Sequence, residues 1–345
     1  SARRAAVGFP LASVRPVTQE GGLLWTPSGE RIAASRLASF QSWLGVERGL
    51  TFASYDELHQ WSVDHLGDFW GALDNWLGLR WSTPYDGVLT NTDMPGATWF
   101  PGGRTNYAEH LLYPLQRAEL EDVAVIAARE DGREVSLNWR ELRTQVGAVR
   151  YWMEQHGVGK GDRVVALLPN GAEALIAMLA TASLGAIWAS CSPDFGPTAI
   201  ADRFAQIEPK LLFAVAGYEY GGKQYDITAT VEELRGQLPT LRETVLVPYL
   251  DPTARLRAAT PWVELLACGG TLSFEPMAFD DPLWVLYSSG TTGLPKPILH
   301  CHGGILLEHA KQLALHLDLG PGDRFFWFST TGWMMWNLLL AALHT

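Results

Sequence analysis

The sequence predicts an α/β fold in which a mostly parallel sheet is covered by helices on both faces. From about residue 122 onward, short apolar runs alternate with longer segments of helical character, which is typical of strand–helix–strand units. Several of these runs are apolar at every position, as expected of strands that are buried on both faces. A chain of 345 residues with 47% hydrophobic content can also bury the large core that this fold needs.

Residues 1–110 are predicted to form a helical and irregular segment that precedes the sheet. Within it, residues 55–79 place apolar side chains such as Leu58 and Leu73 near helical spacing, which predicts a helix. Residues 90–104 are dense in turn-forming residues and predict a surface connection.

The sheet and its covering helices are predicted within residues 111–345. One helix has well-marked ends, because Asn138 can cap it, Glu141 stands at its third position and Gly157 follows it. The predicted helices are residues 138–156, 171–184, 197–207 and 305–317. The predicted strands are residues 123–128, 163–168, 186–190, 211–216, 245–247 and 284–287. The chain is therefore divided into an N-terminal segment, residues 1–110, and the first part of a larger domain, residues 111–345.

The charge balance argues against nucleic acid as a partner. The formal net charge is −11, and the 26 lysines and arginines form no run denser than Arg3-Arg4. An acidic chain without a basic patch repels phosphate backbones and anionic lipid surfaces. We therefore expect no nucleic acid among its partners.

Neither a membrane span nor a disulfide framework is expected. Residues 174–193 carry no charge over about twenty positions, the length of a span. Gly185, however, divides them into a helix-like and a strand-like part. The three cysteines, Cys191, Cys268 and Cys301, fit neither a disulfide scaffold nor a paired metal motif. We therefore expect a cytoplasmic protein.

The sequence WVLYSSGTTGLPK at residues 284–296 has the chemistry of a phosphate-binding loop. An apolar strand runs into small and hydroxylated residues, whose hydroxyls and backbone N–H groups can approach phosphate oxygens. Lys296 adds a positive charge. A flexible turn would have the same composition, but the buried strand before the loop and the lysine after it favour phosphate binding. The candidate residues are Ser288, Ser289, Gly290, Thr291, Thr292, Gly293 and Lys296.

Three other patterns are interpreted structurally. GVGKGD at residues 157–162 lies between a predicted helix and a predicted strand, so it is interpreted as a helix cap and turn. His300-Cys301-His302 has no distant Cys/His pair to complete a tetrahedral metal site. Gly303-Gly304 are expected to mark the turn into the helix at residues 305–317. The sequence also has no GxSxG nucleophile motif.

The loop resembles the phosphate-loop signature of the adenylate-forming superfamily, which includes acyl-CoA synthetases, luciferases and the adenylation domains of peptide synthetases. LNWRELR at residues 137–143, the stretch at residues 157–196 and STTGWMMWN at residues 329–337 resemble further core motifs of this superfamily. SYDELHQWSVDHLGDFW and WFPGGRTNYAEHLL are similar to the leading segment of its short-chain acetyl-CoA synthetase branch. The resemblance covers nearly the whole chain and implies a layered adenylation domain.

The resemblance implies a two-step acid–thiol ligase. A carboxylate attacks the α-phosphate of ATP, which arrives with Mg²⁺, and the coenzyme A thiol then displaces AMP from the acyl-adenylate. Residues 288–293 would hold the β- and γ-phosphates, and Thr291, Thr292 and Lys296 would act in catalysis. Pre-placed donors and cations are needed because an anionic nucleophile approaches a polyanion.

The resemblance also implies residues for the acid and for coenzyme A. Trp333 stands where the branch separates the acid pocket from the pantetheine tunnel, and Met334, Met335 and Asn337 would line that region. The two methionines replace smaller residues of the acetate-using pattern. The alternative is that Trp333, Met334, Met335 and Trp336 are core residues. Gly221, Gly222 and Lys223 match a coenzyme A phosphate element in which Tyr220 replaces the leading arginine, so a solvated loop lysine is equally expected.

SPDFGPTAIADRFAQIEPKLLF and GWMMWN most resemble the acetoacetate-activating members of the branch. The expected partners are therefore ATP, acetoacetate and coenzyme A. The alternatives are an acetyl- or propionyl-CoA synthetase and, from another class, a nucleotide-binding module without catalysis. Because the superfamily pattern continues beyond GWMMWN, this chain is expected to correspond to the N-terminal half of a longer ligase and to lack full activity alone.

Overall fold

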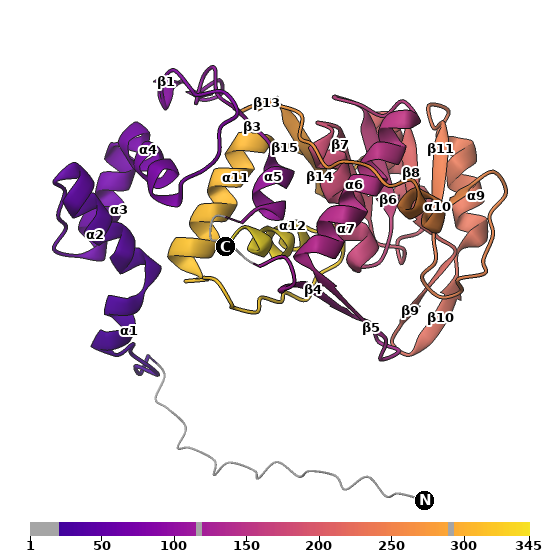
Figure 1. Ribbon diagram of the computed structural model, residues 1–345, viewed down its shortest axis with the longest axis horizontal. Coiled ribbons are helices and arrows are strands. Elements are labelled where there is room, and N and C mark those ends of the chain that lie inside the picture. Colours follow the sequence, from indigo (N-terminus) through magenta and orange to yellow (C-terminus); the bar gives the residue numbers. More distant parts are fainter. Residues whose placement is uncertain (1–20, 115–118, 289–292) are drawn as a thin grey trace, which may run out of the picture.

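A seven-stranded sheet forms the centre of the protein in the computed structural model, which describes residues 21–114, 119–288 and 293–345 (Figure 1). The strand order is β12-β11-β8-β6-β7-β14-β15. All neighbouring pairs are parallel except β14 and β15, which form an antiparallel hairpin. The predicted α/β fold with a mostly parallel sheet is confirmed. The strands are β6 (Arg163–Leu167), β7 (Ile187–Cys191), β8 (Leu211–Val215), β11 (Glu243–Val247), β12 (Thr260–Pro261), β14 (Pro282–Ser288) and β15 (Lys296–Cys301).

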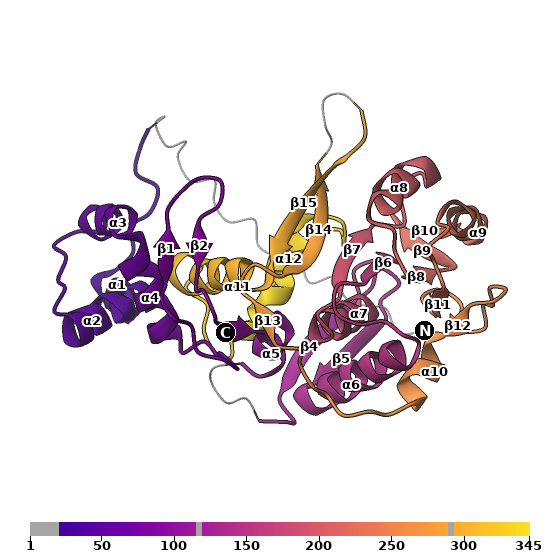
Figure 2. The ribbon, with the colours of Figure 1, turned by 90° about the horizontal axis from the view of Figure 1, so that it is seen from above.

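Helices cover both faces of this sheet. Figure 2 shows α6 and α7 on one side of the sheet, and α8 and α9 on the other. The helix α6 begins with the predicted capping box, in which Asn138 and Glu141 each bond the other's backbone N–H. These helices are α6 (Trp139–Gln155), α7 (Ala172–Ser183), α8 (Pro197–Phe204) with the 3-10 turn η1 (Ala205–Ile207), α9 (Thr228–Gln237) and α10 (Trp262–Ala267).

The uncharged stretch at residues 174–193 forms the predicted helix–strand pair, because α7 ends at Ser183 and β7 follows. Within the described ranges, no helix is long and apolar enough to cross a membrane.

The strand predicted at residues 123–128 is β4 (Val123–Ala128), but it does not join the central sheet. It pairs with β5 (Glu134–Asn138) in a separate antiparallel ribbon, and Val123 and Ile126 are exposed. The expectation that this fully apolar run is a strand of the central sheet, buried on both faces, is therefore wrong. An apolar run shows that a strand buries some surface, but it does not show which sheet the strand enters.

The last part of the chain places two further helices near the sheet. The helix α11 (His302–Lys311), continued by the π-helical turn η2 (Gln312–His316), begins before Gly303, so the two glycines lie in its first turn and do not precede it. The helix α12 (Met334–Ala341) is continued by the 3-10 turn η3 (Ala342–His344). In both ribbon views α12 lies next to β14 (Figure 1, Figure 2).

The N-terminal segment is helical and packs against α11 (Figure 1). The predicted helix at residues 55–79 is broken at His65 into two helices, and residues 90–104 contain short strands. The guanidinium of Arg36 lies over the Trp76 ring, and the ammonium of Lys311 lies over the Trp70 ring. The elements are α1 (Gly29–Ala34), α2 (Arg36–Arg48), α3 (Tyr55–Asp64), α4 (Leu66–Leu77), β1 (Leu89–Asn91), β2 (Thr98–Trp99), β3 (Arg104–Thr105) and α5 (Tyr107–Leu112).

Four buried histidines line the contact between α5, α11 and η3. The Tyr107 hydroxyl lies 2.9 Å from Nδ1 of His309, and the Tyr107 N–H donates to Nδ1 of His302 at 3.2 Å. The rings of His110 and His344 lie 5.7 Å apart. Burial lowers the pKa of His110, His302 and His309 to about 3 and that of His344 to about 4. These five residues, called the histidine seam below, are therefore neutral at pH 7.

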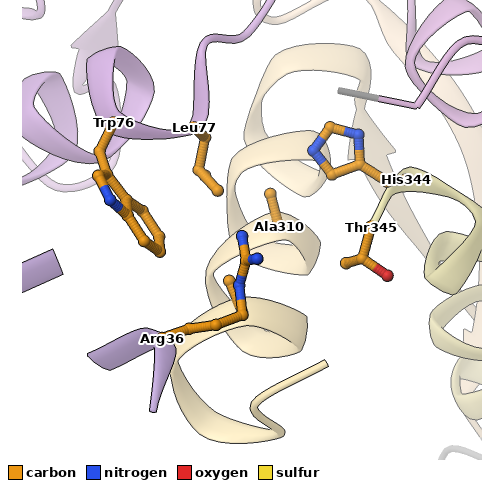
Figure 3. A pocket seen from close by; sticks show the side chains of 7 residues that line it. Arg36, Trp76, Leu77, Ala310, His344 and Thr345 are labelled. Atoms are coloured by element: carbon orange, nitrogen blue, oxygen red, sulfur yellow. The ribbon is translucent and has the colours of Figure 1, made fainter. Parts of the chain in front are cut away.

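A cavity of about 220 Å³ lies beside the seam, between the N-terminal segment and α11 (Figure 3). The Arg36 guanidinium and the His344 imidazole face it, and the rest of its lining is Trp76, Leu77, Ala310, Ala314 and Thr345. None of the sequence-predicted site residues lines this cavity. It lies at the C-terminal end of α12, whereas the predicted acid-binding residues lie at the N-terminal end.

Candidate functional site

The candidate site lies at one edge of the central sheet. Because β6, β7, β8 and β14 are parallel, their carboxyl ends meet at the same edge. The chain passes from β6 to β7 on one side and returns to β8 on the other, so the connections change direction at β6. Open α/β sheets bind ligands in the crevice outside such a point. This edge, called the carboxyl edge below, receives the predicted phosphate loop and the predicted acid-binding segment.

The predicted phosphate loop connects β14 and β15. Ser288, the last residue of β14, pairs with Lys296, the first residue of β15, so the two residues flank the loop. Gly293 has φ of +93°, which favours glycine, and the Lys296 side chain is exposed. The four central residues, Ser289, Gly290, Thr291 and Thr292, lie outside the described residues. The unit of β14, the loop and β15 is called the phosphate hairpin below.

Two hydrogen bonds hold the base of the phosphate hairpin against α8 and η1. The Tyr287 hydroxyl donates to the carbonyl oxygen of Arg203 at 2.8 Å, and the Gln206 amide donates to the carbonyl oxygen of Pro295 at 3.0 Å. Burial raises the pKa of the Tyr287 hydroxyl above its ordinary value, so this group stays a neutral donor. Both ends of the loop, at Tyr287 and Pro295, are therefore fixed to neighbouring elements.

The predicted acid-binding residues lie where α12 begins. Trp333 and Met334 are 61% and 48% exposed, so their side chains are open at the carboxyl edge. Met335 is half-buried and packs against a small cluster of Leu313, Leu338 and Ala341. Asn337 is buried, and neither of its amide atoms has a hydrogen-bond partner within the described part of the chain.

Four residues that the sequence prediction did not select, Thr331, Ser190, Trp336 and Asn170, fix this segment to the sheet. Thr331 bonds both to Leu168, which follows β6, and to Ser190 in β7. Trp336 donates its indole N–H to the Asn170 side chain at 3.0 Å. The signal available in the sequence was that Asn170 and Ser190 are polar residues at the carboxyl ends of two predicted strands.

The predicted coenzyme A residues lie on a different hairpin. β9 (Gly217–Tyr220) and β10 (Lys223–Asp226) are joined by Gly221 and Gly222, both with positive φ, and the Lys223 side chain is exposed. This hairpin follows β8, which three strand spacings, or about 14 Å, separate from β14 in the sheet. The Gly222 N–H donates to a Glu130 carboxylate oxygen at 3.1 Å. An acidic group therefore lies beside the proposed phosphate contact.

The remaining sequence patterns have structural roles. In GVGKGD, Gly157 and Gly161 have positive φ, and Lys160 pairs with Asp281 at 2.9 Å, which confirms a cap and turn. His300 accepts a hydrogen bond from the Trp284 indole and His302 accepts one from the Tyr107 backbone. Across the described residues, no group of three His, Cys, Asp or Glu side chains could hold a metal ion.

Residues 115–344 match the family description of AMP-binding enzymes. The chain belongs to this family. Residues 55–111 match the description of the acetyl-coenzyme A synthetase N-terminus. The carboxyl edge of the sheet, with the residues that flank the predicted phosphate loop, lies within the part of the chain that matches this family.

Several proteins that are similar to this chain are named acetoacetyl-CoA synthetase. The chain is 41% identical to the acetoacetyl-coenzyme A synthetase of Rhizobium meliloti over 326 residues, which are 93% of this chain and 49% of the relative. It is 38% identical to the acetoacetyl-CoA synthetase of Rattus norvegicus over 346 residues, covering 96% and 50%. The structure of acetoacetyl-CoA synthetase from Streptomyces lividans shares 49% identity and a TM-score of 0.89, covering 93% of this chain and 50% of that chain. The chain spans about half the length of the curated relatives it matches.

Proposed function

We propose that this chain forms the ATP- and acid-binding part of an acetoacetate–CoA ligase. In the first step the acetoacetate carboxylate attacks the α-phosphorus of ATP, and pyrophosphate leaves with the bonding electron pair. In the second step the coenzyme A thiol loses its proton and attacks the acyl carbon, and AMP leaves. The relatives named acetoacetyl-CoA synthetase support this substrate, because they align with more than nine-tenths of the chain.

The observation that carries the proposal is the convergence of the phosphate hairpin and the start of α12 on one edge of the sheet. β14 delivers Ser288 to this edge, and the contacts of Thr331 with β6 and β7 deliver Trp333 and Met334 to it. Ser288 and Lys296, which flank the hydroxyl- and glycine-rich loop, are therefore carried at the edge that also presents an open, apolar surface. An activated acid needs both features, because one end of it reacts with a polyanion while the other end must be recognised.

The residues are proposed to divide the work as follows. Lys296, Thr291 and Thr292 neutralise and orient the triphosphate within the loop of residues 288–293, and Mg²⁺ arrives as part of the ATP complex. Trp333, Met334, Met335 and Asn337 shape the acid pocket. Gly221, Gly222 and Lys223 contact the phosphate groups of coenzyme A. We also propose the boundary between the two parts of the chain at residue 110, and a cytoplasmic location, which the free cysteines Cys191, Cys268 and Cys301 support.

A second candidate is an acetyl- or propionyl-CoA synthetase. The match of residues 55–111 to the acetyl-coenzyme A synthetase N-terminus favours it. The two candidates differ only in the acid, so they share the phosphate hairpin and differ at the start of α12.

The test is acid-dependent pyrophosphate release from ATP. Because the chain spans half of its relatives, it is joined to the remaining half of the Streptomyces lividans protein to give a full-length enzyme. We expect acetoacetate to give a higher kcat/KM than acetate or propionate. Activity with acetate or propionate but not with acetoacetate would contradict the proposed acid. Binding of ATP that survives Lys296→Ala, with no adenylate formed from any acid, would indicate a non-catalytic nucleotide-binding module.

A further inference from the structure

The segment of residues 331–337 combines exposed side chains with buried attachments. Trp333 and Met334 are exposed, whereas Thr331 is 1% exposed and Trp336 is fully buried. This anchored segment, as it is called below, lies outside β6 and β7, where the chain direction changes in the sheet. The buried residues Thr331 and Trp336 therefore hold this segment in place, and the exposed residues Trp333 and Met334 do not.

Thr331 connects two neighbouring strands of the sheet. Its hydroxyl donates to the carbonyl oxygen of Leu168 at 2.8 Å, and its own carbonyl oxygen accepts from the Ser190 hydroxyl at 2.6 Å. Leu168 follows directly after β6, and Ser190 lies in β7. Both bonds are buried, where an unpaired donor or acceptor is costly. One threonine therefore ties the segment to the carboxyl ends of both strands.

The backbone next to Thr331 also approaches the sheet closely. A Cβ atom at Gly332 would lie 3.1 Å from the carbonyl oxygen of Ser190 and 3.4 Å from Cα of Cys191. At the other end of the segment, the Trp336 ring stacks on Trp188 of β7, with 6.4 Å between ring centroids. The indole N–H of Trp336 donates to Asn170. The segment is therefore held at both ends, with Trp333 and Met334 between.

We propose that Thr331 is a positioning residue for the acid: its two hydrogen bonds fix the exposed side chains of the anchored segment relative to the phosphate hairpin. This inference rests on the proposed function, because it assumes that the acid binds at Trp333 and Met334. Thr331 does not contact the substrate and acts through the backbone that follows it. A displacement of about 1 Å at a reacting group can lower a rate by about 10²-fold, so such a residue affects turnover from a distance.

The test uses three variants in the joined full-length enzyme. Thr331→Val keeps the shape of the side chain but removes the donor to Leu168, and Thr331→Ser restores a hydroxyl. The matched control is Thr181→Val, because Thr181 is also buried and its hydroxyl donates to the carbonyl oxygen of Ala177 within α7 at 2.7 Å. All three are compared by the KM for acetoacetate, the KM for ATP and kcat.

We expect Thr331→Val to raise the KM for acetoacetate at least about tenfold and to leave the KM for ATP within about twofold. Thr331→Ser should recover most of the loss, and Thr181→Val should match the unsubstituted enzyme in both constants. An equal change in both KM values, or no recovery by serine, would overturn the proposal, because a general loss of structure would then explain the effect.

Hydrogen exchange on the 345-residue chain itself provides a second measurement that needs no activity. The amides of Trp333 and Trp336, which donate to the carbonyl oxygens of Thr330 and Trp333, should exchange at least about tenfold faster in Thr331→Val than in Thr331→Ser or Thr181→Val. Unchanged exchange in these residues would overturn the positioning role. If the joined enzyme releases no pyrophosphate with acetoacetate, the proposed function fails, and the exchange rates still decide whether Thr331 holds the segment.

Discussion

A titratable side chain is exposed at the carboxyl edge of the sheet, whereas those of the histidine seam are buried. At the carboxyl edge, Lys296 is exposed, and Ser288 and Lys296 form the strand pair that flanks the hydroxyl-rich loop. At the seam, four imidazoles are enclosed by aromatic and aliphatic side chains and kept neutral by burial. A cluster of titratable groups therefore does not by itself mark a ligand-binding site. The seam lies enclosed in the contact of α5, α11 and η3, and the edge carries the groups that can meet a ligand.

The largest expected effect is a loss of folding stability at low pH, which comes from the histidine seam and not from the carboxyl edge. The folded pKa values of the seam histidines lie below their ordinary value of 6.5, so the unfolded chain binds more protons than the folded chain as pH falls. Stability should be fully present above pH 6.5. Below pH 6.5, each seam histidine should lower the free energy of unfolding by about 1.4 kcal/mol per pH unit until the pH reaches its folded pKa. Urea unfolding of the chain between pH 7 and pH 5 measures this loss.

The matched variants for this prediction are His309→Gln and His59→Gln. His309→Gln removes one titrating group of the seam and should reduce the slope of stability against pH by about one proton. His59 is exposed on α3, so His59→Gln should leave the slope unchanged. A stability that stays constant down to pH 5 would show that the seam histidines titrate as if they were exposed.

At the carboxyl edge, the largest effect is expected on the rate and not on stability. Lys296→Ala should lower pyrophosphate release by about 10²- to 10³-fold, as is typical when one group that stabilises a developing charge is removed. Its urea midpoint should not change, because the side chain is exposed. Lys160→Ala, in the GVGKGD turn, is the control and should keep the rate within a few-fold. Equal losses in both variants would mean that Lys296 acts only through net charge.

Substitutions at two glycines test how tightly the backbone packs at two places on the carboxyl edge. Gly332→Ala should destabilise the chain by about 1–3 kcal/mol, because the new Cβ would meet the backbone of Ser190 and Cys191. Gly293→Ala should cost only about 1 kcal/mol, because its positive φ is the strain and no described atom lies within 4 Å of the new Cβ. Urea unfolding ranks the two. The reverse order would mean that the anchored segment is loosely held.

The smallest expected effect concerns the choice of acid. If Met335 lines the acid pocket, Met335→Thr should change the relative kcat/KM of acetoacetate and propionate by about tenfold while the KM for ATP stays constant. Met334→Thr provides the comparison, because Met334 is exposed and Met335 packs on Leu313. A lower urea midpoint with an unchanged ranking of acids would place Met335 in the core.

Local patterns predicted the elements that depend on neighbouring residues. The capping box of α6, the helix–strand pair of α7 and β7 and the buried strands β6, β8 and β14 were all predictable, because each is encoded by residues a few positions apart. The phosphate hairpin was recognisable as a loop for the same reason. The roles of its residues stay predictions, and four of them lie outside the described residues.

Features that depend on distant residues were not predictable. The helical spacing of residues 55–79 did not show the break at His65, and an apolar run could not show that β4 leaves the central sheet. The bond between Thr331 and Leu168 joins residues 163 positions apart, so no local pattern contains it. The neutral histidines of the seam likewise come from separate elements. Their sequence positions gave no sign that they would meet.

The bridge made by Thr331 also sets an order of events during synthesis. At about 5–20 residues per second, roughly 8–30 s pass between the addition of Leu168 and that of Thr331. During this interval the Leu168 carbonyl and the Ser190 hydroxyl lack the partner that Thr331 gives them in the folded chain. The strands β6 and β7 can therefore pair first and act as a template. The stretch that presents Trp333 can join the sheet only after these two strands have been made.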